Sequence, residues 1–124
     1  MKEIIETDDA PAAVGAYSQG TATEDLVFTA GQIPLTPDGE PVDGSVAEQT
    51  EQALENVAAV LEAGGSSLDD AVKVTVFLED IDDFDEMNQT YEKFFDDEPP
   101  ARSAVEVAEV PKGFAVEIEA VGVR

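Results

Sequence analysis

The internal arginine of this chain is its most distinctive candidate for chemistry. Arg102 lies in the run PPARSAVEVAEVPKG (99–113), and the only other arginine is Arg124. A guanidinium keeps its positive charge at physiological pH, and its planar fork can bind both oxygens of a carboxylate. Arg102 is therefore a candidate for holding the acid group of a small ligand.

Glu117 is the candidate that could act on water beside such a ligand. It lies in the last apolar run, FAVEIEAVGV (114–123), and strand alternation places it on the same face as Glu119. A partly buried carboxylate can have a raised pKa and serve as a base. The residues leave a second interpretation open, which is a structural ion pair of Arg102 with Glu117, Glu119 or Glu106.

The composition excludes several kinds of site. The chain has no cysteine and no histidine, so disulfides, thiolate nucleophiles and the commonest metal ligand are absent. Its 29 acidic and six basic residues give a net charge of −23. Nucleic-acid affinity comes mainly from counterion release by Lys and Arg, so we expect no nucleic-acid partner and no binding to anionic membranes.

The acidic residues are spread along the whole chain, which predicts adaptation to a high-salt cytoplasm. Charges are screened within ~3 Å at 1 M salt, so an acidic, halophilic protein avoids self-repulsion there. An ordinary acidic protein is the alternative. The N-terminal run MKEIIETDDA has no hydrophobic region or cleavage-site pattern, and no apolar stretch approaches the ~20 residues of a membrane span. We therefore expect a cytoplasmic protein with a single domain over residues 1–124.

Hydrophobic periodicity predicts the order βββαβαββ, an α+β fold. The expected strands are residues 2–6, 16–20, 26–33, 71–80, 101–110 and 114–123. Pro111-Lys112-Gly113 would join the last two strands as a hairpin. In the strand at 71–80, Val72, Val74, Val76 and Leu78 are expected on one face.

Two helices are expected between these strands. The first begins at Ser45, because Ser45 and Glu48 form a capping box, and Gly64-Gly65 ends it. Asp82 or Asp83 would cap the second, which stops before Pro99-Pro100. The apolar stripe of the second helix is interpreted as core, with no chemistry assigned to it: Phe84, Met87, Tyr91 and Phe94.

Both helices are expected on one face of a mixed sheet. The other face is uncovered and partly apolar, with Phe77, Val121 and Val123, and such a face usually packs against a partner. We therefore expect a homo-oligomer. If Arg102 reaches the region of Glu117, the two would share a semi-buried cleft between subunits.

The motifs of this chain resemble those of the RidA (YjgF) family of enamine/imine deaminases. The resemblance covers about all 124 residues without a large gap. The segments that carry it are APAAVGAYSQG (10–20), TAGQIPLTPDGE (29–40), residues 49–95, PARSAVEVAEVPKG (100–113) and VEIEAVGV (116–123).

The resemblance implies a chorismate-mutase-like homotrimer in which the sheets form a central barrel and clefts lie between neighbouring subunits. It also implies a hydrolase that converts 2-imino or 2-enamino acids, such as 2-aminoacrylate and 2-iminobutyrate, to 2-oxo acids and ammonia. That reaction protects PLP enzymes and uses no cofactor and no metal. The alternative is a non-catalytic small-carboxylate-binding or chaperone-like protein on the same fold.

The resemblance also implies roles for particular residues. Arg102 matches the arginine that holds the substrate carboxylate, Glu117 the acid that orients water, and Tyr17 a tyrosine that lines the cleft. The expected substrate-binding positions are Gly31, the backbone at Ala104, Asn88 and Phe84. Tyr17 could instead be a packing aromatic, Gly31 could serve tight strand packing, and Asn88 could be a surface residue.

Three positions depart from the pattern of the family. Ala30 stands where a serine is common, Ala104 where a cysteine is common, and Ala16 where a proline is common. Loss of the serine removes a hydroxyl that could bind substrate, and Ala16 could loosen the loop that carries Tyr17. These departures bear on the range of substrates more than on the reaction.

Overall fold

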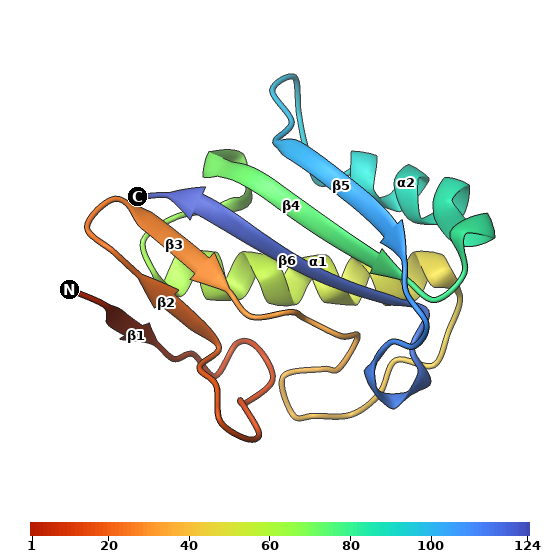
Figure 1. Ribbon diagram of the computed structural model, residues 1–124, viewed down its shortest axis with the longest axis horizontal. Helices are drawn as coiled ribbons and strands as arrows, with labels where there is room; N and C mark the ends of the chain where they lie inside the picture. Colours follow the sequence, from red (N-terminus) through yellow and green to blue (C-terminus); the bar gives the residue numbers. More distant parts are fainter.

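Six strands form one mixed sheet in the order β1-β2-β3-β6-β4-β5 in the computed structural model, which describes residues 1–124 (Figure 1). The strands are β1 (Glu3–Ile5), β2 (Gly20–Ala22), β3 (Leu26–Thr29), β4 (Ala71–Leu78), β5 (Ala101–Glu106) and β6 (Val116–Val123). Strand β4 pairs in parallel with β5 and antiparallel with β6, and all other pairings are antiparallel. The expected α+β class and the order βββαβαββ are confirmed.

Two helices, α1 (Val46–Ala63) and α2 (Phe84–Glu92), lie on one side of the sheet, behind it in Figure 1. The opposite face is left without a helix, as expected. Neither helix has the length and apolarity that a membrane-crossing helix needs.

The capping box predicted for the first helix is present. Ser45 Oγ accepts a hydrogen bond from the Glu48 backbone N–H at 3.2 Å, and Glu48 Oε1 accepts from the Ser45 N–H at 3.1 Å. At the other end, the N–H of Gly64 donates to the carbonyls of Val60 and Leu61. Both ends of α1 are thus fixed by local sequence, as the spacing predicts.

The core lies between α1, α2 and the sheet. Val74, Val76 and Leu78 of β4 and Val116 and Ile118 of β6 are fully buried there. Their alternate neighbours point to the uncovered face, because successive side chains in a strand face opposite ways. The site residues are therefore assigned to a face by their register with these core positions.

The predicted hairpin between the last two strands is wrong. Strands β5 and β6 do not pair with each other but flank β4 on its two sides. The reason is the helix between β4 and β5: a β-α-β connection returns the chain parallel to β4, at the edge that β6 does not occupy. The run at 111–113 is a short 3-10 turn instead.

Three local predictions also need correction. The strand expected at 16–20 contributes only Gly20 to β2, because residues 7–19 form a loop. A β-bulge between Ala71 and Lys73 turns Val72 outward, so that it is 46% exposed. Asp83 precedes α2 but makes no side-chain cap, whereas Asp80 Oδ1 accepts from the Asp82 N–H at 2.9 Å.

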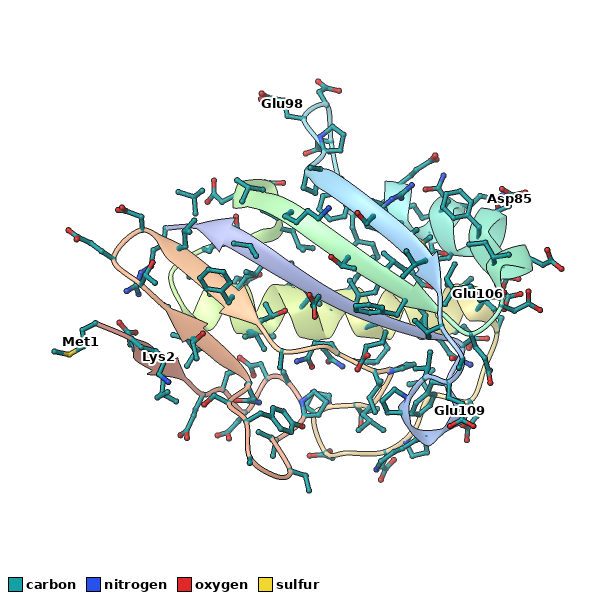
Figure 2. All side chains as sticks on the ribbon, viewed as in Figure 1. Met1, Lys2, Asp85, Glu98, Glu106 and Glu109 are labelled. Carbon is teal, nitrogen blue, oxygen red and sulfur yellow. The ribbon has the colours of Figure 1, made fainter.

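The surface is dominated by acidic side chains that have no cationic partner. Figure 2 shows Asp85, Glu98, Glu106 and Glu109 projecting outward from α2 and from the segments around β5. The chain holds one ion pair, between Arg124 Nη2 and Glu3 Oε1 at 3.1 Å. Most of the negative charge is therefore uncompensated within the chain.

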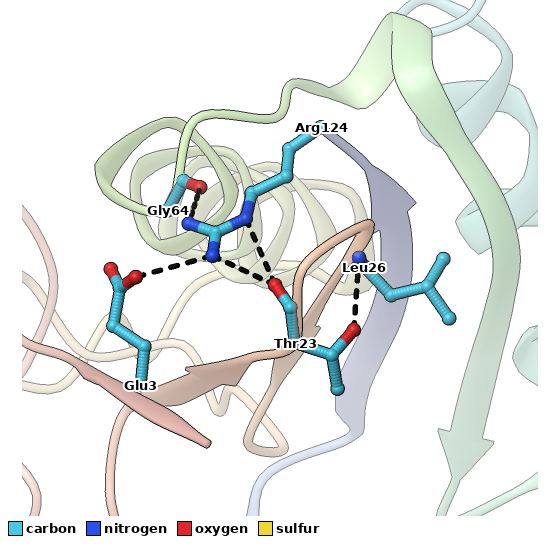
Figure 3. Close-up of polar contacts among 5 residues, drawn as sticks. All are labelled: Glu3, Thr23, Leu26, Gly64 and Arg124. Atoms are coloured by element: carbon cyan, nitrogen blue, oxygen red, sulfur yellow. Dashed lines mark hydrogen bonds and ion pairs between the residues drawn. The ribbon is translucent and has the colours of Figure 1, made fainter. Parts of the chain in front are cut away.

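Arg124 ties three elements together (Figure 3). Its Nη2 and Nε donate to the carbonyl of Thr23 at 2.7 and 3.1 Å, and its Nη1 donates to the carbonyl of Gly64 at 3.2 Å. A cation at the last carbonyls of a helix also complements the helix dipole. The second arginine of the chain is thus structural.

Candidate functional site

Glu117 lies at the floor of a pocket of about 560 Å³ on the uncovered face of the sheet. We call this the Glu117 pocket. Its lining comes from the loop before β2, the segment after β3, strand β6 and the turn before it: Pro11, Ala12, Val14, Tyr17, Gln19, Ala30, Gly31, Gln32, Ile33, Leu35, Pro111, Lys112 and Glu117. Segments far apart in the sequence thus meet around one carboxylate.

Gly31 is required by the position of the Glu117 side chain. A Cβ added at Gly31 would lie 2.8 Å from Glu117 Oε2 and 2.9 Å from its Cδ. The segment is held against β6 by a bridge, in which Gln32 N donates to the Ile118 carbonyl at 2.7 Å and Ile118 N donates back at 3.0 Å. The close packing at Gly31 is therefore against the Glu117 carboxylate.

The environment of Glu117 favours its protonated form. Burial raises the pKa of the Glu117 carboxyl, and the negative charge of Glu119 on the same face raises it further. No Lys or Arg lies within ion-pair distance of the Glu117 carboxylate. A carboxylate with a raised pKa is a better proton acceptor than an ordinary glutamate, which suits it to act on water.

Tyr17 lines the same pocket as Glu117. The residue is 54% exposed, and its hydroxyl oxygen accepts a hydrogen bond from the Val14 N–H at 3.2 Å. That contact uses the oxygen as an acceptor, so the phenolic proton remains available to a ligand. In the single chain, Tyr17 is therefore not packed into the core.

Lys112 is the only cation that lines the Glu117 pocket. Its backbone is left-handed, with φ 61°, which is uncommon outside glycine. Gly113 follows with φ 74°, so the two residues together turn the chain into β6. Sequence reasoning placed this turn in a hairpin and gave the lysine no role.

Arg102 lies in a different pocket, of about 460 Å³, which we call the Arg102 pocket. The lining comes from α2, the segment after it and the start of β5: Asn88, Tyr91, Glu92, Phe95, Asp96, Pro99, Pro100 and Arg102. The Arg102 pocket and the Glu117 pocket share no lining residue.

The guanidinium of Arg102 is held by neutral groups. Its Nη1 donates to Asn88 Oδ1 at 2.7 Å, and its Cζ lies 5.3 Å from the centre of the Phe84 ring and 4.6 Å from that of Tyr91. No carboxylate lies within ion-pair distance, so the structural ion pair with Glu106, Glu117 or Glu119 is wrong for the chain alone. The charge of Arg102 is left available for an anion.

Tyr91 is the residue at this pocket that sequence reasoning missed. Phe84, Asn88 and Tyr91 are separated by four and three residues, so one face of α2 presents all three to Arg102. The helical spacing of apolar residues predicts only a core position for Tyr91. It is buried, and burial raises the pKa of its phenol while the positive charge of Arg102 opposes that rise. In this structure Asn88 and Phe84 both contact the Arg102 guanidinium directly.

The sheet register places Arg102 and Glu117 on opposite faces. Arg102 is level with Val74, which faces the core. Glu117 is level with Phe77, which lies on the uncovered face. Neighbouring residues in register share a face. Hence one chain does not bring the guanidinium and the carboxylate together.

The three departures from the family pattern lie in different surroundings. Ala30 lines the Glu117 pocket, and its N–H donates to the Gln19 carbonyl at 2.8 Å. Ala104 is half-buried against the core, level with Val76. Ala16 is exposed in the loop next to Tyr17.

No group of three or more acidic side chains is arranged to hold a metal ion.

Comparison with known proteins gives the family. A family model described as "Endoribonuclease L-PSP" matches residues 7–124. The chain is 47% identical, over 100% of its own length and 99% of the relative's, to a protein of Escherichia coli K12 named 2-iminobutanoate/2-iminopropanoate deaminase. The chain belongs to the RidA (YjgF) family.

Solved structures of RidA-family members agree with this assignment. The crystal structure of the YjgF gene product of E. coli superposes with a TM-score of 0.93 at 47% identity, covering 98% of each chain. The structure of E. coli TdcF with bound serine has a TM-score of 0.94 at 46% identity, again covering 98% of each chain. The second of these relatives therefore binds a small amino acid.

Proposed function

We propose that this protein hydrolyses 2-imino acids to 2-oxo acids and ammonia, in a homotrimer whose clefts each combine two subunits. Each cleft would join the Glu117 pocket of one subunit to the Arg102 pocket of its neighbour. The RidA-family relatives with this activity in their names support the reaction, and the separate locations of the two charged groups support the shared cleft.

The observation that carries the proposal is the Glu117 carboxylate at the floor of its pocket. It is half-buried, it has no cationic partner, and its raised pKa marks a carboxylate that accepts a proton readily. A purely structural glutamate in such a place would be costly, because burial of an unpaired charge is unfavourable. A role in the reaction therefore explains a glutamate at position 117 better than a role in packing does.

The proposed reaction adds water across the C=N bond. Arg102 binds the substrate carboxylate through its fork, which leaves the imine carbon over the Glu117 pocket. Glu117 accepts a proton from water as the water oxygen bonds to that carbon, and the imine π electrons move to nitrogen. Glu117 returns that proton to the nitrogen, which gives a neutral carbinolamine. Glu117 then takes the hydroxyl proton and passes it to the nitrogen as the C–N bond breaks, so that ammonia leaves and the C–O bond becomes a carbonyl.

Tyr17 supplies the second polar contact in this scheme. Because its oxygen already accepts from Val14, its phenolic proton is free to donate to the substrate or to the attacking water. The backbone at Gly31 and Ala104 would complete the cleft. The carbon skeleton of the imine then contacts the apolar part of the lining.

The test couples a threonine or serine dehydratase to this protein in the presence of semicarbazide. The dehydratase releases the imine, and semicarbazide traps whatever has not been hydrolysed. Active protein lowers the semicarbazone signal in proportion to its concentration, and Arg102→Ala restores the signal. Equal semicarbazone with and without the wild-type protein would refute the deaminase, even if 2-oxobutyrate bound to it.

A further inference from the structure

The buried amide of Gln19 holds the loop that forms one wall of the Glu117 pocket. Gln19 is 5% exposed. Its Oε1 accepts from the Thr7 N–H at 2.8 Å, and its Nε2 donates to the carbonyls of Thr7, Ala10 and Pro11 at 3.0, 3.2 and 2.8 Å. One side chain thus makes four hydrogen bonds to the main chain of residues 7–11.

This loop has little main-chain support of its own. Apart from the turn at Asp8 and Asp9, residues 6–18 form no helix or strand, and none of their main-chain groups makes a close hydrogen bond to another main-chain group. Buried backbone groups need partners, and here a side chain supplies them in place of a strand or helix. Ala10 is the only residue of this loop that is buried in the core, whereas Val14 is 83% and Tyr17 54% exposed, so side-chain burial fixes the loop at one small residue alone.

Gln19 also connects the wall of the pocket to its floor. Its own carbonyl accepts from the Ala30 N–H at 2.8 Å, next to the glycine on which the Glu117 side chain packs. Tyr17 lies two residues before Gln19, and its hydroxyl is tied back to Val14. A displacement at Gln19 therefore moves the phenol relative to the Glu117 carboxylate.

We propose that Gln19 is a positioning residue, which sets the place of Tyr17 relative to Glu117 in their shared pocket through the network of four hydrogen bonds to residues 7–11. Its side chain acts through the loop and does not act on the substrate. The kinetic part of this inference rests on the proposed function. The structural part does not, because the position of the Tyr17 ring is measurable without turnover.

The structural test uses Gln19→Met, which keeps the length of the side chain and removes all four hydrogen bonds. The chain contains two tyrosines, so protein labelled with 3-fluorotyrosine gives two ¹⁹F resonances, assigned with Tyr17→Phe and Tyr91→Phe. We expect the Tyr17 resonance to shift or sharpen while the Tyr91 resonance stays in place. An unmoved Tyr17 resonance would overturn the proposal, and so would equal movement of both.

Gln49→Met is the matched control for loss of a bridging amide. Gln49 Nε2 donates to the Gly44 carbonyl at 3.1 Å and its Oε1 accepts from the Ala115 N–H at 2.8 Å, away from the Tyr17 loop. This variant measures the general cost of removing such an amide. A Tyr17 resonance that moves equally in the Gln49 and Gln19 variants would refute a specific role for Gln19.

The kinetic test is a double-mutant cycle with Tyr17→Phe. Misplacement of a polar group by about 1 Å can cost up to about a hundredfold in rate, so we expect Gln19→Met to lower kcat/KM about tenfold or more. In the Tyr17→Phe background the same change should cost less than about twofold, because the group it positions is gone. An equal loss in both backgrounds would overturn the proposal. If the wild-type protein shows no turnover, the deaminase proposal is refuted. The ¹⁹F test of the position of Tyr17 is unaffected by that result.

Discussion

Arg102 and Glu117 lie on opposite faces of the same sheet, two strands apart, with β4 between them. The guanidinium rests on α2 and the carboxylate lies in the pocket on the uncovered face. A reaction that needs both groups on one small molecule must therefore take them from two copies of the chain. The next experiment tests that requirement directly.

Two inactive variants should restore activity to each other when they are mixed. Arg102→Ala and Glu117→Gln are each expected to be inactive, and mixed oligomers contain clefts with a native arginine from one subunit and a native glutamate from another. After co-refolding at equal amounts, about a quarter of the clefts carry both native groups, the product of two even chances. The semicarbazide assay measures the recovered rate.

The control for the mixing experiment is the same pair of variants assayed together without exchange of subunits. Mixtures that stay inactive after co-refolding would contradict a cleft that combines Arg102 of one subunit with Glu117 of another. A double variant that carries both substitutions, refolded alone, gives the background rate of the assay.

Glu117→Gln should stabilise the protein while it abolishes turnover. The pKa of Glu117 is raised in the folded state, so the fold binds this proton more tightly than the unfolded chain does. Its contribution to stability is full at low pH and is lost as pH rises through the folded pKa. Thermal unfolding should show a higher Tm for the variant at pH 7, and the two Tm values should converge at acid pH.

The same shift sets the pH dependence of the reaction. If Glu117 is the base, kcat/KM falls on acidification with an inflection above the ordinary pKa of glutamate, because protonated Glu117 cannot accept from water. The Glu119→Gln variant removes a neighbouring negative charge and should move this inflection to lower pH. If the inflection is unchanged in Glu119→Gln, a group other than Glu117 causes the fall in kcat/KM at acid pH.

Gly31→Ala should lower activity with a small effect on folding. The new Cβ would meet the Glu117 carboxylate at 2.8 Å, and the end of that side chain is the part that can move away. Displacement of the base by about 1 Å can cost up to about a hundredfold in kcat/KM. Urea unfolding should give a loss of no more than about 1 kcal/mol. If Gly31→Ala keeps full activity, the carboxylate does not need its present position.

Added salt should raise the stability of this protein strongly. A net charge of −23 with a single ion pair leaves the folded state under self-repulsion. The Debye length falls from about 10 Å at 0.1 M to about 3 Å at 1 M, so the repulsion is largely removed over that range. Thermal scans in KCl measure the effect, with sucrose at equal osmolality as the control. A Tm that rises equally in sucrose, or stays flat in KCl, would contradict adaptation to high salt.

Local signals predicted the elements whose ends are fixed by nearby residues. The capping box at Ser45 and Glu48 is present, and Val74, Val76 and Leu78 share the buried face as alternation predicts. Such features depend on residues within one turn or one strand. The bulge that turns Val72 outward depends on pairing with β6, and the strand pattern contains no signal for it.

The placement of Arg102 could not be predicted for a related reason. Alternation put Arg102 and Ala104 on one face of their strand, but which face meets the helices depends on how β5 joins the sheet. The expected hairpin would have paired β5 with β6, whereas the connection through α2 pairs it with β4. Spacing along α2 did predict that Phe84 and Tyr91 share one side, and only the pairing shows that Arg102 lies there.

Helix α2 has consequences for how proteins of this kind diverge. Its turns bury Met87 and Tyr91 in the core and also present Phe84 and Asn88 to Arg102. A mutation on α2 that alters the surroundings of Arg102 therefore also disturbs the hydrophobic interior, and selection against unfolding would remove many such changes. None of residues 11–17, which line the Glu117 pocket in part, is buried in the core. Substitutions that change the preference for the carbon skeleton of a ligand should therefore arise there first.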